Sequence, residues 1–192
     1  MADLIGLVPT GTYPPGSLYG YASVIDGDWA AVSAPDAEAG TLSRAGIVYL
    51  FMHDGTDWTY TGHLADPDSV ADSVFGTRIA LSGNLLAVSS EGTARVHTYH
   101  LAGTTWTHVA SLSHLSNSPS ASVFGIGLGL SGTHLAIGSH TDAYDVSLGL
   151  CRGTVYTYEW LGGGWSSESE LSLGSYVGLG HTLALDGDRL AV

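Results

Sequence analysis

The sequence has no lysine, and its five basic residues are arginines against 18 acidic residues, which gives a formal net charge of −13 over 192 residues. Nucleic acids and anionic membrane surfaces are bound through clustered Lys and Arg, so this deficit argues against both as partners. The single cysteine, Cys151, excludes an internal disulfide and a cysteine-based zinc site. No apolar run approaches the ~18 residues of a membrane span, so we predict no membrane insertion. The start, MADLIGLVPTG, lacks the basic and apolar regions of a signal peptide.

Internal repeats are the main feature that is present. The hydrophobic content of 44% is sufficient for a folded core. Each repeat begins with an aromatic residue or Leu followed by Gly, and runs through an alternating stretch and an x-Gly-x turn to an apolar end. Four such segments align without gaps, at 19–32, 75–88, 124–137 and 179–192. A second shared block follows the first three, at 46–51, 94–99 and 153–158, and a Gly-containing turn then precedes Trp58, Trp106 and Trp165.

The pattern within each unit predicts strands. Alternation with period 2 in Val-, Tyr- and Thr-rich runs is typical of strands, and x-Gly-x between two such runs is typical of a hairpin turn. In the second unit we expect strands over 77–81, 85–89, 94–100 and 105–112. A repeated four-stranded antiparallel unit of about 50 residues is typical of a β-propeller blade.

We therefore predict an all-β fold, a partial β-propeller of four-stranded antiparallel blades. It has about three full blades, at 19–74, 75–123 and 124–178, and a partial blade at each end. Residues 1–18 are expected to hold the outer strand of a preceding blade, through 3–10, and residues 179–192 the first two strands of a further one. Because the chain stops before an expected third strand, we expect it to be part of a longer protein that supplies the rest of the propeller.

The shared motif residues are expected to have structural roles. The aromatic residue or Leu packs between neighbouring blades, Gly lies where two backbones approach closely, and Trp covers the gap to the next blade. These residues are Tyr19, Gly20, Phe75, Gly76, Phe124, Gly125, Leu179, Gly180, Trp58, Trp106 and Trp165.

These segments resemble the FG-GAP repeat of integrin α-subunit propellers and of many bacterial surface and secreted proteins. Phe75-Gly76 and Phe124-Gly125 match the FG, Ser33-Ala34-Pro35 matches the GAP, and residues 46–51 match the Gly-x-Val-Tyr-x-Phe strand. Other residues stand at the GAP position in the next two units, Ser89-Ser90-Glu91 and Gly138-Ser139-His140. The resemblance implies a binding or cell-adhesion module of a secreted or cell-surface protein.

The resemblance also raises the question of calcium. Calcium-binding members of the family have Asp-x-Asp-x-Asp-Gly loops between the first two strands of a blade, whereas a hairpin turn too short to wrap a cation stands there in this sequence. We predict the calcium-free variety of the repeat, with no cofactor. The one carboxylate cluster similar to a calcium loop, Asp66-Pro67-Asp68 with Asp72, lacks the Gly and the closing Glu.

Nine histidines invite a search for a metal site. His97 and His100 share an expected strand but have opposite parity, so they point to opposite faces. His140 with Asp142 is the best pair, but two ligands do not make a site. We interpret the histidines as isolated surface or edge residues and predict no bound metal.

The expected topology places the long, variable loops on one face of the molecule. Binding residues concentrate on such loops when a rigid scaffold holds them. This long-loop face is acidic, which favours a cation-bridged or basic partner, or alternatively serves only to keep a protein with few charges soluble. The candidate ligand-binding residues on it are Asp36, Glu38, Asp66, Asp68, Asp72, Glu91, His140, Asp142 and Asp145.

We predict no catalytic residues and a non-catalytic module that binds a protein or glycan. The Gly-rich segment at 125–132 has neither the Gly-x-Ser-x-Gly elbow of a hydrolase nor the βαβ unit of a dinucleotide site. The alternative is a fragment of a glycan-active propeller enzyme, similar to a glycosidase or sialidase, whose active site lies largely in other blades. His53, Leu101 and Leu161 replace the Asp of the sialidase-type turn. A purely architectural propeller that spaces other domains is a third hypothesis.

Overall fold

The computed structural model describes residues 6–9, 15–68, 70–114, 123–142, 144–145, 149–172 and 178–192, with the backbone alone at 144–145. This part of the chain contains strands and one short 3-10 turn, η1 (Glu91–Thr93), and no α-helix. No helix in it is long and apolar enough to cross a membrane. The all-β prediction is therefore confirmed.

The strands form three four-stranded antiparallel meanders. The first sheet contains β1 (Ser23–Asp26), β2 (Trp29–Ala34), β3 (Ile47–His53) and β4 (Trp58–Ala65). The second contains β5 (Phe75–Ser82), β6 (Leu85–Ser90), β7 (Arg95–Ala102) and β8 (Thr105–Leu112). The third contains β9 (Gly127–Ser131), β10 (His134–Ser139), β13 (Thr154–Glu159) and β14 (Ser169–Leu171). The four-stranded antiparallel unit is thus confirmed three times, and all four strands expected in the second unit occur.

Two hairpins complete the described chain. β11 (Tyr144–Asp145) pairs with β12 (Leu150–Cys151) inside the connection between β10 and β13. β15 (Ala184–Asp186) pairs with β16 (Arg189–Ala191) and lies beside β9 of the third sheet. Residues 6–9 belong to no strand, and the rest of the strand expected at 3–10 lies outside the described residues.

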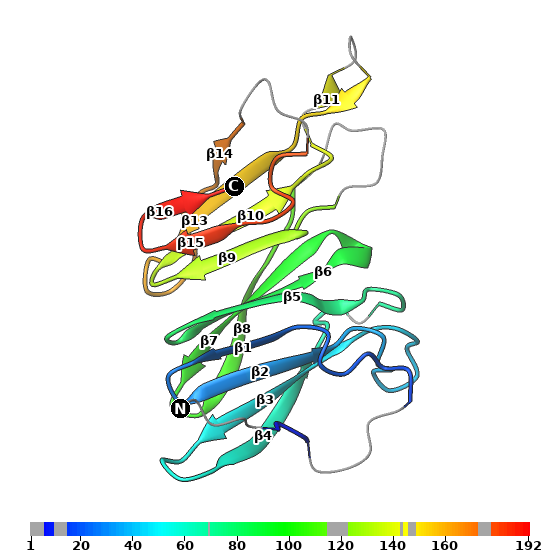
Figure 1. Ribbon diagram of the computed structural model, residues 1–192, viewed down its shortest axis with the longest axis vertical. Helices are drawn as coiled ribbons and strands as arrows, with labels where there is room; N and C mark the ends of the chain where they lie inside the picture. The colour runs from blue at the N-terminus through cyan, green and yellow to red at the C-terminus, as the bar shows by residue number, and fades with distance from the viewer. Residues whose placement is uncertain are drawn as a thin grey trace.

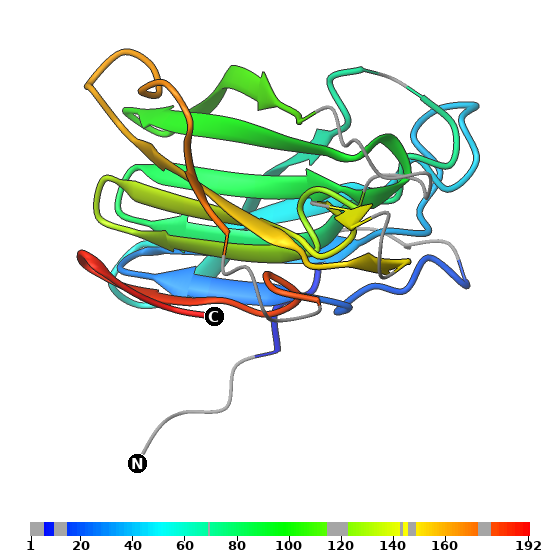
Figure 2. The same ribbon diagram turned by 90° about the horizontal axis from the view of Figure 1, so that it is seen from above.

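Consecutive sheets are related by the same contacts. Figure 1 shows the three sheets stacked along the long axis of the molecule, and Figure 2 shows the same layers from above. The first strands are neighbours throughout: β1 lies beside β5, β5 beside β9, and β9 beside β15. The hairpin turns that follow these strands are also linked, because the residue before each turn glycine accepts a hydrogen bond from the next turn. The bonds are Gly83 N–H to Asp26 Oδ2 (2.6 Å), Gly132 N–H to Ser82 Oγ (2.9 Å) and Gly187 N–H to Ser131 Oγ (2.9 Å).

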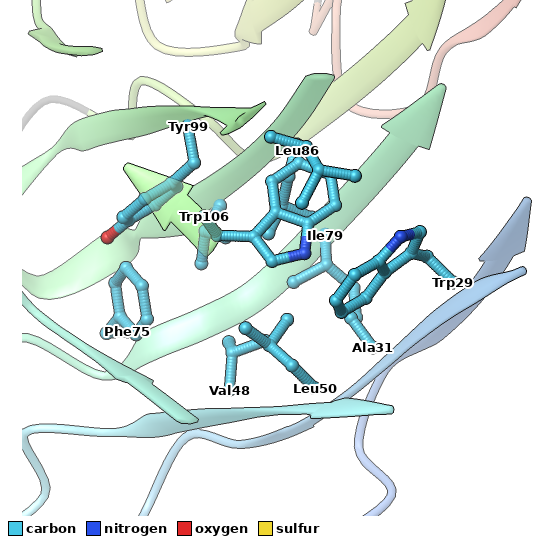
Figure 3. Close-up of a cluster of buried hydrophobic side chains, with 11 residues drawn as sticks. Trp29, Ala31, Val48, Leu50, Phe75, Ile79, Leu86, Tyr99 and Trp106 are labelled. Atoms are coloured by element: carbon cyan, nitrogen blue, oxygen red, sulfur yellow. The ribbon is translucent and has the colours of Figure 1, made fainter. Parts of the chain in front are cut away.

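Apolar side chains fill the space between the sheets. Figure 3 shows the cluster between the first two sheets, in which Trp29 and Leu50 of the first sheet meet Phe75, Ile79 and Trp106 of the second. The indole rings of Trp29 and Trp106 meet edge to face, with centroids 5.5 Å apart. A second cluster lies between the second and third sheets, around the fully buried Phe124, Leu135, Ile137 and Tyr156. Most of the core therefore lies between sheets.

The first sheet also carries an apolar cluster on its outer face, which no described sheet covers. This cluster includes Val32, Tyr49 and Phe51. Leu7 packs against it, and its carbonyl accepts a hydrogen bond of 2.5 Å from the Tyr19 hydroxyl.

The shared motif residues lie at these inter-sheet contacts. Phe75 and Phe124 are fully buried, and Tyr19 lies at the edge of the outer-face cluster. The Trp165 indole N–H donates to Thr98 Oγ1 of the neighbouring sheet at 2.9 Å. Trp58 has the equivalent place on the uncovered face of the first sheet. Leu179 forms a parallel bridge with Gly153 of the third sheet.

The surroundings of three motif glycines show why these positions require Gly. Gly76 has a φ of +96°, and a Cβ built on it would lie 2.8 Å from Ser33 Cβ and 3.0 Å from Val48 Cγ2 of the first sheet. A Cβ on Gly125 would meet Ser89 and Val96 of the second sheet in the same way. At Gly180 it would lie 2.8 Å from a carbonyl oxygen of the third sheet. Gly76, Gly125 and Gly180 thus each allow the next sheet or hairpin to approach the second and third strands of the sheet before.

Candidate functional site

Loops from the first two sheets enclose a groove of about 570 Å³. Its walls come from the residues before β1, the β2–β3 loop, the β4–β5 connection and η1. Figure 2 shows these longer loops at one end of the layered sheets and short turns at the other. Three of the residues expected to bind a ligand, Asp36, Asp72 and Glu91, line this long-loop groove together. Its volume lies within the range of small-molecule sites.

Arg44 forms ion pairs with two of the acidic residues that line the long-loop groove. Its Nε lies 3.2 Å from Asp36 Oδ1, and its Nη1 lies 3.4 Å from Asp72 Oδ1. Both ion pairs are exposed, so each contributes little to stability by itself. The Arg44–Asp72 pair links the β2–β3 loop to the β4–β5 connection, whereas the Arg44–Asp36 pair lies within the β2–β3 loop.

Backbone strain is concentrated in the same place. Five described non-glycine residues have a positive φ, and four of them line the long-loop groove: Leu18 (57°), Arg44 (47°), Asp72 (59°) and Val74 (47°). The left-handed region disfavours side chains with a Cβ, most of all β-branched ones such as Val74. Residues in such conformations cost about 1–3 kcal/mol each and cluster at binding and catalytic sites.

Two further groups are available to a ligand. The Tyr21 side chain lines the groove and is 52% exposed. The Glu91 carboxylate makes no hydrogen bond or ion pair with the rest of the described chain. It lies close enough to His140 to raise the pKa of that imidazole, although burial and the neighbouring His181 lower the same pKa more. His140 therefore lies near the long-loop groove without lining it.

The other residues expected on this face are placed elsewhere. Asp142 is buried, and its Oδ2 accepts a hydrogen bond of 2.9 Å from the Tyr156 hydroxyl. Burial first, and then this carboxylate, raises the pKa of Tyr156 well above its usual range. Glu38 is exposed on the β2–β3 loop but does not line the groove. Asp145 lies in β11, and its side chain is outside the described part of the structure.

Asp66 and Asp68 form a separate cluster with a histidine from the next sheet. Asp66 is buried and accepts hydrogen bonds from the Asp68 N–H (2.8 Å) and the Ser90 hydroxyl (3.0 Å). His97 on β7 is completely buried, and its Nε2 lies 3.4 Å from Asp66 Oδ1. Arg95 pairs with Asp68 at 3.1 Å. The interpretation of the histidines as isolated surface or edge residues is therefore wrong for His97.

His97 shows what sequence reasoning missed. Its position on the strand correctly separated it from His100, but parity says nothing about what covers each face. The covering residues come from the connection after β4, about 30 residues earlier in the chain. The sequence pattern singled out Asp66 and Asp68 as a carboxylate cluster and His97 as a strand residue, but nothing local to either segment joined them.

Comparison with known proteins adds no assignment. No protein-family model matches the chain, and no curated protein sequence matches it. The FG-GAP resemblance therefore stays a prediction that depends on the repeated segments themselves.

Proposed function

We propose that this protein is a non-catalytic binding module, an arc of an FG-GAP-like β-propeller, and that it recognises a protein or glycan through the long-loop groove. Support for the propeller comes from the repeated relation between sheets: adjacent first strands, linked hairpin turns and glycines that allow close approach. Four-stranded meanders related in this way are typical of propeller blades. We propose, as the resemblance implies, that the module works at the cell surface or outside the cell as part of a longer protein.

The main observation in favour of a binding role is that the strained backbone residues line the groove. Three segments around the groove hold four residues in unfavourable conformations, and such preorganisation lowers the entropy lost when a ligand binds. The exposed Tyr21 ring offers an apolar surface, and the Glu91 carboxylate can accept hydrogen bonds from hydroxyl or cationic groups.

The same groove gives no support to a hydrolase. A glycosidase needs one carboxyl group as acid and a second as base or nucleophile, facing each other across the substrate. Asp36 and Asp72 both pair with the guanidinium of Arg44, at 3.2 and 3.4 Å. Carboxylates that share one arginine in this way are suited to positioning the loops around the groove and not to acting as an acid and a base.

Ligand arrays test the proposal. We expect the protein to bind members of a glycan array or of a library of basic peptides, and we expect Tyr21→Ala and Glu91→Gln to weaken that binding at least tenfold. Both side chains are at least partly exposed to solvent, so the variants should keep the native near-UV circular dichroism. Glu159→Gln, an exposed acid on β13, serves as the matched control. Binding that is indifferent to both groove variants, or absent from both arrays, would contradict the proposal.

A further inference from the structure

The Asp66–Asp68–His97 cluster joins two sheets and lies apart from the long-loop groove. Asp66 and Asp68 belong to the connection that leaves β4, whereas His97 belongs to β7 of the second sheet. One ligand atom from each residue can be chosen so that all three lie within 4.8 Å of one another. The Asp68 side chain is 32% exposed, so the cluster opens to solvent on that side.

The imidazole of His97 has one ring nitrogen that is satisfied and one that is not. Nδ1 lies 2.9 Å from the Ser111 hydroxyl, which in turn lies 3.2 Å from His108 Nε2. When Nδ1 carries the proton, the Ser111 hydroxyl accepts a hydrogen bond from Nδ1 and donates one to His108 Nε2. Nε2 is buried and makes no hydrogen bond, although it faces Asp66 Oδ1 at 3.4 Å. A buried polar atom without a partner is costly, so Nε2 is available to a ligand at this position.

The contact between Nδ1 and Ser111 is compatible with either neutral tautomer of His97. With the proton on Nε2, the N–H faces Asp66 Oδ1 at 3.4 Å but makes no hydrogen bond with it. With the proton on Nδ1, the Nε2 lone pair points at a carboxylate oxygen, and two such electron-rich atoms repel each other in a buried site. A cation between Nε2 and the carboxylates would satisfy all three groups.

The spacing and ligand types indicate which cation. Bonds of about 2.0–2.1 Å to a tetrahedral zinc ion place neighbouring ligand atoms about 3.3 Å apart. The Nε2–Oδ1 distance of 3.4 Å is close to that value. Calcium takes six to eight oxygen ligands and has little use for an imidazole nitrogen, whereas zinc binds His and Asp. The Ser111 hydroxyl, which fixes the orientation of the ring, matches the outer partner that metal-bound histidines usually have.

We propose that Asp66, Asp68 and His97 bind a zinc ion, with water as the fourth ligand. Asp68 reaches the ion by a small side-chain movement while its other oxygen keeps Arg95. The ion links the connection after β4 to β7, and so clamps the first sheet to the second. This role is structural and independent of ligand binding in the long-loop groove.

Isothermal titration of the whole chain with zinc chloride, after dialysis against EDTA and then against metal-free buffer, tests this site. Asp68→Asn is the main variant because its exposed side chain can change without disturbing the core, and His97→Gln is the second. The matched controls are His53→Gln and Asp57→Asn, on β3 and in the turn after it. Cobalt chloride supplies a spectroscopic probe, since four-coordinate cobalt absorbs strongly in the visible range.

We expect one zinc ion per chain, weakened at least tenfold by Asp68→Asn, lost in His97→Gln and unchanged in both controls. Zinc should raise the melting temperature of the wild type but not of Asp68→Asn, because metal that binds only the folded state stabilises it. Three results would each overturn the site: no zinc binding by the wild type, equal zinc binding by wild type and Asp68→Asn, or tighter binding of calcium than of zinc.

Discussion

Alanine at two equivalent motif glycines should have very different effects on stability. Gly20 and Gly76 both have a positive φ, +86° and +96°, so an alanine methyl group is strained by the backbone at either position. The two positions differ in the atoms that surround the added methyl group. A Cβ on Gly76 would meet Ser33 and Val48 of the first sheet, whereas no described atom lies within 4 Å of a Cβ on Gly20.

The magnitudes separate into two contributions. The left-handed backbone costs an L-residue about 1–2 kcal/mol, which is the whole effect expected for Gly20→Ala. At Gly76 the added methyl must push against two fully buried residues at 2.8 and 3.0 Å. Overpacking of this kind costs about 1–3 kcal/mol more. We therefore expect Gly76→Ala to lower the free energy of unfolding by about 2–5 kcal/mol.

Urea denaturation followed by tryptophan fluorescence measures both values. The chain has five tryptophans, and Trp29 and Trp106 report directly on the interface between the first two sheets. The transition midpoint should fall much further for Gly76→Ala than for Gly20→Ala at a similar m-value. Equal losses in the two variants would refute the packing of successive sheets against the motif glycine.

Three further predictions concern buried polar groups, and each is measured by urea denaturation. Trp165→Phe should cost about 1–2 kcal/mol, because it removes both the hydrogen bond to Thr98 and part of the indole ring; no loss would contradict that contact. Tyr156→Phe should cost about 1–3 kcal/mol, because it leaves the buried Asp142 carboxylate without its donor; a neutral result would mean that Asp142 is solvated. In EDTA, wild-type stability should fall as the pH drops below about 6.5, because burial lowers the folded-state pKa of His97 and the unfolded chain takes up the proton first. His97→Gln should flatten that slope, and an unchanged slope would assign it to other groups.

Most of the local architecture could be predicted from the sequence. Strands follow from period-2 alternation, and the turns follow from x-Gly-x, because both depend on residues within a few positions of each other. The repeat made the prediction stronger than any single segment could, since the same four strands were expected three times. The same local logic placed Phe75 and Phe124 in the core.

The candidate sites could be predicted only in part. Asp36, Asp72 and Glu91 were each assigned to the long-loop face, but their meeting in one groove depends on how two sheets stack. Asp142 was assigned to the same face and is instead buried, where it accepts a hydrogen bond from the Tyr156 hydroxyl. Whether a loop residue points outward or folds inward depends on contacts with a distant segment, which no local pattern encodes.

Four antiparallel strands, tight turns and an apolar face could all be predicted for each unit, because they depend on side-chain periodicity and turn chemistry over short distances. The partners of individual polar residues depend instead on how the sheets pack. His97 meets Asp66 because the connection that leaves one sheet packs against the third strand of the next. Contacts of that kind arise from the stacking of whole sheets, and so they appear only once every unit has its place.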